Sequence, residues 1–199
     1  MTSSLVIYLT IFSYLIGSIS SAIIVSQIMG LPDPRKDGSN NPGATNVLRL
    51  GGKTAAAIVL IFDVLKSLLP VLAGHLLELN PASLALVGMA AVLGHVFPLY
   101  YRFAGGKGVA TALGCYFGLY WLLGLISIAI WLICLLVFRF SSLSSLIMVS
   151  FAPVVGAITL GSSMILLPFI LIAFLIAYKH KENILRLRAG TEPYTKLFG

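Results

Sequence analysis

Long apolar runs alternate with short polar segments along this chain, and each run is long enough to cross a lipid bilayer. About 20 predominantly apolar residues make a helix that spans the hydrocarbon core. The pattern therefore predicts an all-α fold, a polytopic membrane helix bundle that forms a single domain over residues 1–199. The apolar runs cover residues 4–29, 54–77, 83–99, 109–138 and 146–178.

The last two runs are ambiguous, because each could form one long helix or two short ones. Thirty residues make a helix of about 45 Å, which exceeds the roughly 30 Å of the core. Residues 118–124 and 161–163 contain glycines or serines that could form turns. Single helices give five spans, and two hairpins give seven.

The distribution of charge favours seven spans. Five spans put Arg139 on the outer side, whereas seven spans put every segment rich in Lys and Arg on one side. The seven-span arrangement follows the positive-inside rule, with the N-terminus outside and the C-terminus in the cytoplasm. The first run has no preceding basic residue and is too long for the core of a signal peptide, so we expect it to be a retained span.

Composition agrees with a membrane protein and excludes several other classes. The chain is 59% hydrophobic and 10% charged, with a mean hydropathy of +1.03, whereas soluble domains are about a quarter charged. The net charge is +7, and the basic residues that carry it lie in the short segments between apolar runs. This placement indicates anionic lipid headgroups or anionic substrates as partners, and not nucleic acid. The spacing of Cys and His predicts no disulfide framework, no metal and no cofactor.

The first polar segment, residues 38–53, is a candidate phosphate site. It reads GSNNPGATNVLRLGGK, where small residues expose backbone N–H groups and Arg49 adds a planar cationic fork. An ordinary loop made of turn residues is the alternative. The neutral side chains that could donate or accept hydrogen bonds there are Ser39, Asn41, Thr45 and Asn46.

The second polar segment, residues 100–108, places Gly105, Gly106 and Lys107 just before a predicted helix. Backbone N–H groups and the helix dipole would together favour an anion at this position. The spacing is not that of a Walker A loop, because Gly108 follows the lysine where Ser or Thr is required. Nucleotide binding is therefore disfavoured.

Two further segments carry polar side chains. Residues 139–145 read RFSSLSS, in which Ser142 and its neighbours could bind phosphate or cap the next helix. In residues 179–188, His180 and Asn183 are three apart and so share a helix face. Anionic headgroups explain the Lys and Arg of that segment, but a headgroup anchor requires neither His180 nor Asn183.

Ionisable residues also occur inside the predicted spans. Asp63 and Lys66 are one helical turn apart, and since charges inside a membrane need partners, we expect them to pair. His95 lies near the inner end of the third span, where we expect it to orient the second polar segment.

Taken together, these segments resemble the bacterial acyl-phosphate:glycerol-3-phosphate acyltransferase family, PlsY. The matching stretches are GSNNPGATNVLRLGGK, FDVLKSLLP, GHVFPLYYRFAGGKGVAT, RFSSLSS and KHKENILRL, in the order of the family and over nearly the whole chain. One departure is Asn40, where the family more often has Gly. If that position has a positive φ, Asn is the next most tolerant residue.

The resemblance implies transfer of an acyl group from acyl phosphate to the 1-hydroxyl of sn-glycerol 3-phosphate, which gives lysophosphatidic acid and phosphate for phospholipid synthesis. It implies a seven-span bundle in the bacterial cytoplasmic membrane, with the active site on the cytoplasmic side and the soluble enzyme that forms acyl phosphate as a candidate partner. The implied catalytic residues are Ser39, Arg49, Lys107, His180 and Asn183, and the implied substrate-binding residues are Asn41, Thr45, Asn46, Gly105, Gly106 and Ser142.

The residues also bear on mechanism and on rival functions. No carboxylate in the motifs is an obvious general base, so we expect direct transfer without an acyl-enzyme, with the proton passing to His180 or to a phosphate oxygen of the donor. A transporter of an anionic solute is the main alternative, but its predicted outer segments are almost without polar groups. A non-catalytic membrane scaffold would leave His180, Asn183 and the glycine-rich segments unexplained.

Overall fold

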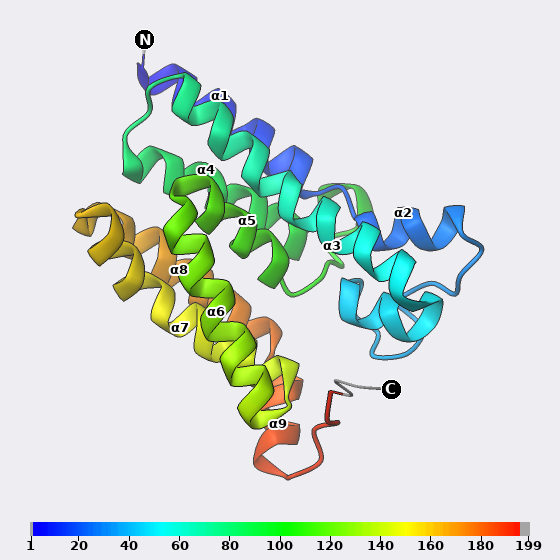
Figure 1. The fold of residues 1–199 in the computed structure, drawn as a ribbon. Helices are drawn as coiled ribbons and strands as arrows, with labels where there is room; N and C mark the ends of the chain where they lie inside the picture. Colours follow the sequence, from blue (N-terminus) through cyan, green and yellow to red (C-terminus); the bar gives the residue numbers. More distant parts are fainter. Residues whose placement is uncertain (1, 196–199) are drawn as a thin grey trace.

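The computed structural model describes residues 2–195, and the regular structure in that range is all helical (Figure 1). The helices are α1 (Thr2–Gly17), α2 (Ser21–Ile28), α3 (Ala44–Leu76), α4 (Pro81–Val96), η1 (Leu99–Tyr101), α5 (Val109–Leu119), α6 (Trp121–Phe138), α7 (Ser141–Leu160), η2 (Ser163–Ile165), α8 (Leu166–Lys179) and α9 (Lys181–Arg188). The predicted all-α membrane bundle is confirmed.

Helix α4 is the central element, since it packs against α1, α3, α5 and α8. Its contact with α1 is a backbone contact made possible by two glycines. A Cβ added at Gly17 would lie 2.3 Å from the carbonyl oxygen of Ala91, and one added at Gly94 would lie 2.3 Å from that of Tyr14. Small residues of this kind let membrane helices approach closely.

Both ambiguous runs are hairpins, as the charge distribution predicted. The first breaks at Tyr120 between α5 and α6, and the second breaks at Gly161, whose φ is 60°, between α7 and α8. Within residues 2–195, five helical segments are long and apolar enough to span a membrane, and a sixth follows if α8 and α9, bent by 63°, count as one. Helix α5 has only 11 residues, so length alone supports five or six spans.

The first apolar run differs from the prediction of one continuous helix, because it breaks between α1 and α2. The break frees the carbonyl of Ile19, which accepts a hydrogen bond from Lys66 Nζ at 3.3 Å. It also turns the hydroxyl of Ser21 toward Asp63, to which it donates at 2.7 Å. A broken helix is tolerated at membrane depth where protein groups satisfy the freed backbone.

Helix α3 starts earlier than the sequence indicated, so part of the predicted first loop is helical. Residues 44–51 form its first two turns because Val47 is fully buried against α2 and the body of α3. At Gly52 the backbone leaves the helical region, with φ 78° and ψ −172°. Thr45, Asn46 and Arg49 therefore lie on a short helical segment before this break.

Candidate active site

The first polar segment is organised by Asn46, which is 1% exposed. Its Oδ1 accepts a hydrogen bond from the Ser39 N–H at 2.8 Å, and its Nδ2 donates to the carbonyls of Pro34 and Asp37 at 3.0 and 2.9 Å. These three bonds use both amide hydrogens and one of the two acceptor positions of the oxygen. The structure thus places Asn46 as the support that fixes Ser39 relative to α3.

The other predicted residues of this segment are more accessible. Ser39, Thr45 and Arg49 are exposed, and Asn41 is half-buried. Asn40 has φ 55°, so the residue that replaces the family's glycine does adopt the left-handed conformation that Asn tolerates. Thr45 and Arg49 are four residues apart on α3 and therefore share one face.

The second polar segment is packed against His95. The N–H of Gly106 donates to the carbonyl of His95 at 3.1 Å. A Cβ at Gly105 would lie 2.1 Å from that carbonyl oxygen, and a Cβ at Gly106 would lie 2.2 Å from Nε2 of the ring. Both positions therefore require glycine, and the expectation that His95 orients this segment agrees with the contacts.

Lys107 connects the second polar segment to the C-terminal one, because its Nζ donates a hydrogen bond to Oδ1 of Asn183. Burial is the main cause that lowers the pKa of Lys107, the charges of Arg186, Lys179 and Arg49 lower it as well, and that of Glu192 raises it. Together these effects bring the pKa from 10.5 to about 8. The first and second segments are also in contact, since a Cβ added at Gly106 would lie 3.0 Å from the carbonyl oxygen of Pro42.

A buried carboxylate holds the third and fourth segments together. Oε1 of Glu192 accepts hydrogen bonds from Ser142 Oγ at 2.6 Å and from Asn183 Nδ2 at 2.7 Å, and Oε2 accepts one from Arg186 Nε at 2.8 Å. Burial raises the pKa of Glu192, but the three donors outweigh it and hold the pKa below its usual range. We call Lys107, Ser142, Asn183, Arg186 and Glu192 the loop cluster.

Glu192 was missed by the sequence analysis, which looked for carboxylates only inside the motifs. The one available signal was an acidic residue just after a strongly basic helix, since Glu192 follows Arg186 and Arg188. The alternative that a serine of residues 141–145 caps α7 is wrong, because the N-cap position is Phe140 and the N–H of Ser141 donates to Oγ1 of Thr195 instead. Ser142 instead contacts Glu192, and Ser144 and Ser145 donate to carbonyls four residues before them.

His180 lies between α8 and α9 and is 3% exposed. Its Nδ1 is 2.8 Å from the carbonyl oxygen of Ile176. Because a carbonyl only accepts hydrogen bonds, Nδ1 carries the proton and Nε2 keeps a free lone pair in the neutral ring. His180 and Asn183 are both buried at the start of α9, as their spacing predicted.

A second polar grouping lies deeper, between α2, α3 and α4. Lys66 Nζ donates to Asp63 Oδ1 at 2.8 Å, which confirms the predicted pair. The same ammonium is 2.6 Å from Nδ1 of His95. All of these side chains are buried. We call Ser21, Asp63, Lys66 and His95 the span cluster.

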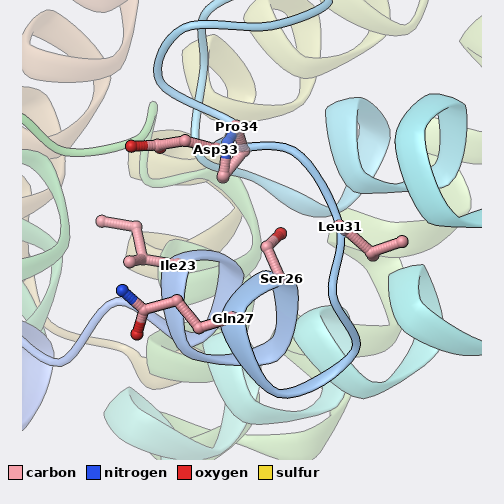
Figure 2. A pocket seen from close by; sticks show the side chains of 6 residues that line it. All are labelled: Ile23, Ser26, Gln27, Leu31, Asp33 and Pro34. Atoms are coloured by element: carbon pink, nitrogen blue, oxygen red, sulfur yellow. The ribbon is translucent and has the colours of Figure 1, made fainter.

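A small hollow of about 80 Å³ lies between α2 and the loop that directly follows it (Figure 2). Small-molecule sites are usually about 300–1,000 Å³, so this hollow is too small for a phospholipid precursor. None of the residues that line the hollow belongs to the loop cluster. The residues that line it are Ile23, Ser26, Gln27, Leu31, Asp33 and Pro34.

The chain is similar to known proteins over nearly its whole length. A model of the family Glycerol-3-phosphate acyltransferase matches residues 7–190. The glycerol-3-phosphate acyltransferase of Methylococcus capsulatus is 49% identical to this chain, over 91% of this chain and 91% of its own length. That of Coxiella burnetii is 50% identical, over 94% of this chain and 96% of its own length. The enzyme of Legionella pneumophila (strain Corby) is 46% identical over 97% of this chain and 70% of its own length.

Solved structures agree with these relatives. The glycerol 3-phosphate form of PlsY, an integral membrane glycerol 3-phosphate acyltransferase, superposes with a TM-score of 0.90 at 38% identity, covering 98% of this chain and 96% of that one. The lysophosphatidic acid form gives 0.88 at 37% identity, covering 98% and 95%. The predicted family is confirmed: this chain belongs to the PlsY-type glycerol-3-phosphate acyltransferases.

Proposed function

We propose that this membrane enzyme transfers an acyl group from acyl phosphate to the 1-hydroxyl of sn-glycerol 3-phosphate and releases lysophosphatidic acid and phosphate. The observation that carries the proposal is Lys107, which lies between the glycine-rich second segment and Asn183, next to the place where Pro42 of the first segment meets Gly106. Both substrates bear a phosphate, and a cluster of cations and neutral donors outside the spans suits two such groups.

The two cations bind the phosphates in this proposal. Lys107 acts as a point charge and Arg49 as a bidentate fork. The N–H of Gly106 is used by the carbonyl of His95, so the backbone N–H groups that follow it, at the start of α5, are the ones that approach an anion. Ser39, Asn41 and Thr45 provide neutral contacts from the first segment, and Asn46 contributes by holding Ser39 in place.

Transfer is direct in this mechanism. The glycerol hydroxyl oxygen attacks the acyl carbonyl carbon, the bond from that carbon to the phosphate oxygen breaks, and phosphate leaves with the bonding electrons. The hydroxyl proton passes to Nε2 of His180, which has a free lone pair, or to an oxygen of the donor phosphate. Lys107 stabilises the charge that develops on the carbonyl oxygen.

Ser142 and Asn183 have a positioning role as well as a binding role. Each already contacts Glu192, and Asn183 also accepts from Lys107. A side chain that an existing hydrogen bond already holds in place loses little conformational freedom when it binds a ligand. Glu192 thus prepares two predicted substrate contacts without itself facing the reaction.

We propose the seven-span topology for this enzyme in the bacterial cytoplasmic membrane, with the N-terminus outside and the loop cluster facing the cytoplasm. Helix α5 would count as a span because protein covers its ends, although it is short. The cytoplasmic side is also where a soluble enzyme could deliver acyl phosphate. A cysteine placed at Arg139 in a variant without Cys115 and Cys134 tests the orientation, since labelling from outside intact cells would contradict it.

The activity is tested with purified protein in lipid, supplied with acyl phosphate and glycerol 3-phosphate and assayed for phosphate and lysophosphatidic acid. Acyl-CoA and acyl-carrier protein are run as alternative donors, and we expect no product from them. Trapping a covalent acyl-serine would refute direct transfer. Flux of glycerol 3-phosphate into liposomes without any acyl donor would instead favour a transporter.

A further inference from the structure

The span cluster fixes the protonation of His95. Nδ1 of His95 lies 2.6 Å from the Lys66 ammonium and 3.5 Å from Oδ1 of Asp63. The ammonium is the closer partner and carries only donors, so Nδ1 accepts from it. Asp63 balances the charge of Lys66 at 2.8 Å, and the hydroxyl of Ser21 donates to the same carboxylate oxygen. With Nδ1 accepting, the neutral ring carries its proton on Nε2. The Asp63–Lys66 pair thus makes His95 a hydrogen-bond donor at Nε2.

This N–H faces the place where the first and second polar segments meet. A Cβ on Gly106 would lie 2.2 Å from Nε2 and 3.0 Å from the carbonyl oxygen of Pro42. Gly106 immediately precedes Lys107, and Pro42 lies between Asn41 and Gly43 of the first segment. His95 is the residue of the span cluster whose ring reaches this junction.

The N–H at Nε2 has no hydrogen-bond partner of its own within residues 2–195. The bonds of His95 there run from Nδ1 and from its backbone. His95 is 8% exposed, and Nε2 is not among the fully buried polar atoms that lack a partner, so the atom keeps a small accessible surface that a ligand can reach. The adjoining segments are those that the proposed function assigns to phosphate groups.

We propose that His95 Nε2–H donates a hydrogen bond to an oxygen of the bound substrate, the glycerol 3-phosphate phosphate or the acyl phosphate, at the junction of the two glycine-rich segments. Asp63 and Lys66 are positioning residues that act through His95 by fixing its tautomer. This inference rests on the proposed function. It adds a donor from inside the helix bundle to a site otherwise built from the loops and helix ends.

Two substitutions of similar size separate this role from a structural one. In His95→Asn the amide reaches about as far as Nδ1, so it can accept from Lys66 but cannot reach the junction. In His95→Gln the amide reaches about as far as Nε2 and can donate there. We expect kcat/KM for glycerol 3-phosphate to fall roughly ten- to a hundredfold in the Asn variant, which is the usual effect of losing one hydrogen bond to a charged group. In the Gln variant we expect a fold-decrease in kcat/KM that is less than half as large.

His75→Asn is the matched control, because His75 contacts the carbonyl of Gly118 near the other end of α3 and should leave kcat/KM within twofold. If the Asn variant is as active as the wild type, or more active than the Gln variant, the inference is wrong. If the wild type itself makes no lysophosphatidic acid, the proposed function fails instead.

A measurement on the unaltered enzyme does not depend on the folding of any variant. Nitrogen-15 NMR of the histidine rings, with the His95 signals assigned by their absence from His95→Gln, should show an unprotonated Nδ1 and a protonated Nε2. Saturating glycerol 3-phosphate or a non-hydrolysable acyl phosphate analogue should shift the Nε2–H signal. A proton on Nδ1, or no shift with either ligand, would overturn the inference.

Discussion

The span cluster and the loop cluster each hold a lysine and a carboxylate, but the two pair directly only in the span cluster, because the carboxylate of the loop cluster pairs with Arg186 instead. In the span cluster, Lys66 contacts the carboxylate of Asp63 directly at 2.8 Å. In the loop cluster, Glu192 is satisfied by Ser142, Asn183 and Arg186, and the direct contact of Lys107 is the neutral amide of Asn183. Direct pairing neutralises a charge inside the bilayer, whereas the indirect arrangement leaves a cation whose charge an anionic ligand can still pair with.

The two buried histidines repeat the contrast. Lys66 makes Nδ1 of His95 an acceptor, so its outer nitrogen donates. The Ile176 carbonyl makes Nδ1 of His180 a donor, so its outer nitrogen accepts. A histidine ring can therefore present either a hydrogen-bond donor or an acceptor at Nε2, and the group that contacts Nδ1 determines which one.

The largest effect should come from the unpaired cation. Lys107→Ala should lower kcat roughly a thousandfold or more, the upper range for loss of a group that stabilises an oxyanion. The measurement is steady-state release of phosphate by purified enzyme in lipid. Lys36→Ala, an exposed lysine just before the first polar segment, is the control and should stay within twofold. A Lys107→Ala enzyme with a tenth of wild-type kcat would remove Lys107 from the chemistry.

The second effect concerns stability, because the span cluster is a buried ion pair. Asp63→Ala leaves Lys66 buried without its counter-ion and should cost about 3–5 kcal/mol. Thermal unfolding in a fixed detergent measures this as a large decrease in Tm. The double variant Asp63→Ala with Lys66→Met removes both charges and should recover most of the loss. Equal Tm values for the single variant and the wild type would contradict a paired, buried charge.

A smaller effect is expected at Glu192. Glu192→Gln keeps an oxygen for one donor but gives up the charge-assisted bonds, so it should cost about 1–2 kcal/mol of stability. KM for glycerol 3-phosphate should rise, since Ser142 and Asn183 lose their common anchor. Glu182→Gln, on the exposed side of α9, is the matched control. If both variants behave alike, the carboxylate does not organise the loop cluster.

The mildest test is a change of pH. The pKa of Lys107 is lowered to about 8, so the ammonium is present below about pH 8 and is lost above it. Log kcat/KM, which reports the free enzyme, should fall by about one per pH unit above that value. Log kcat should begin to fall at higher pH, because bound phosphate stabilises the ammonium. A flat kcat/KM profile up to pH 10 would show that the charge of Lys107 is not required.

Hydropathy and charge predicted most of the fold. The turns at Tyr120 and Gly161 followed from run length and the position of Arg139. The break between α1 and α2 could not be predicted, because Ser18 and Ser20 interrupt the apolar run only slightly. The break is stabilised by Lys66 from a helix distant in sequence. It depends on a tertiary contact, and a local sequence pattern does not report such contacts.

Much of the candidate site was also visible in the sequence, because Gly, Asn, Lys and Arg gather in four short segments. The missing part was the connection between segments. Glu192 lies nine residues from Asn183 and 50 from Ser142, and no local pattern reports contacts of that kind. Asn46 was expected to contact substrate, and only the folded loop shows that its amide is occupied by Ser39, Pro34 and Asp37.

The break at Gly52 affects how the enzyme fits its membrane. Helix α3 has 33 residues, about 50 Å if straight, which exceeds any ordinary hydrocarbon thickness. Because the backbone leaves the helix at Gly52, only the part from Lys53 onward, about 36 Å, has to match the bilayer by tilting. The turn that carries Arg49 stays fastened to its own loop through Asn46. Membranes of different thickness can therefore host this helix without changing the height of the arginine above the lipid.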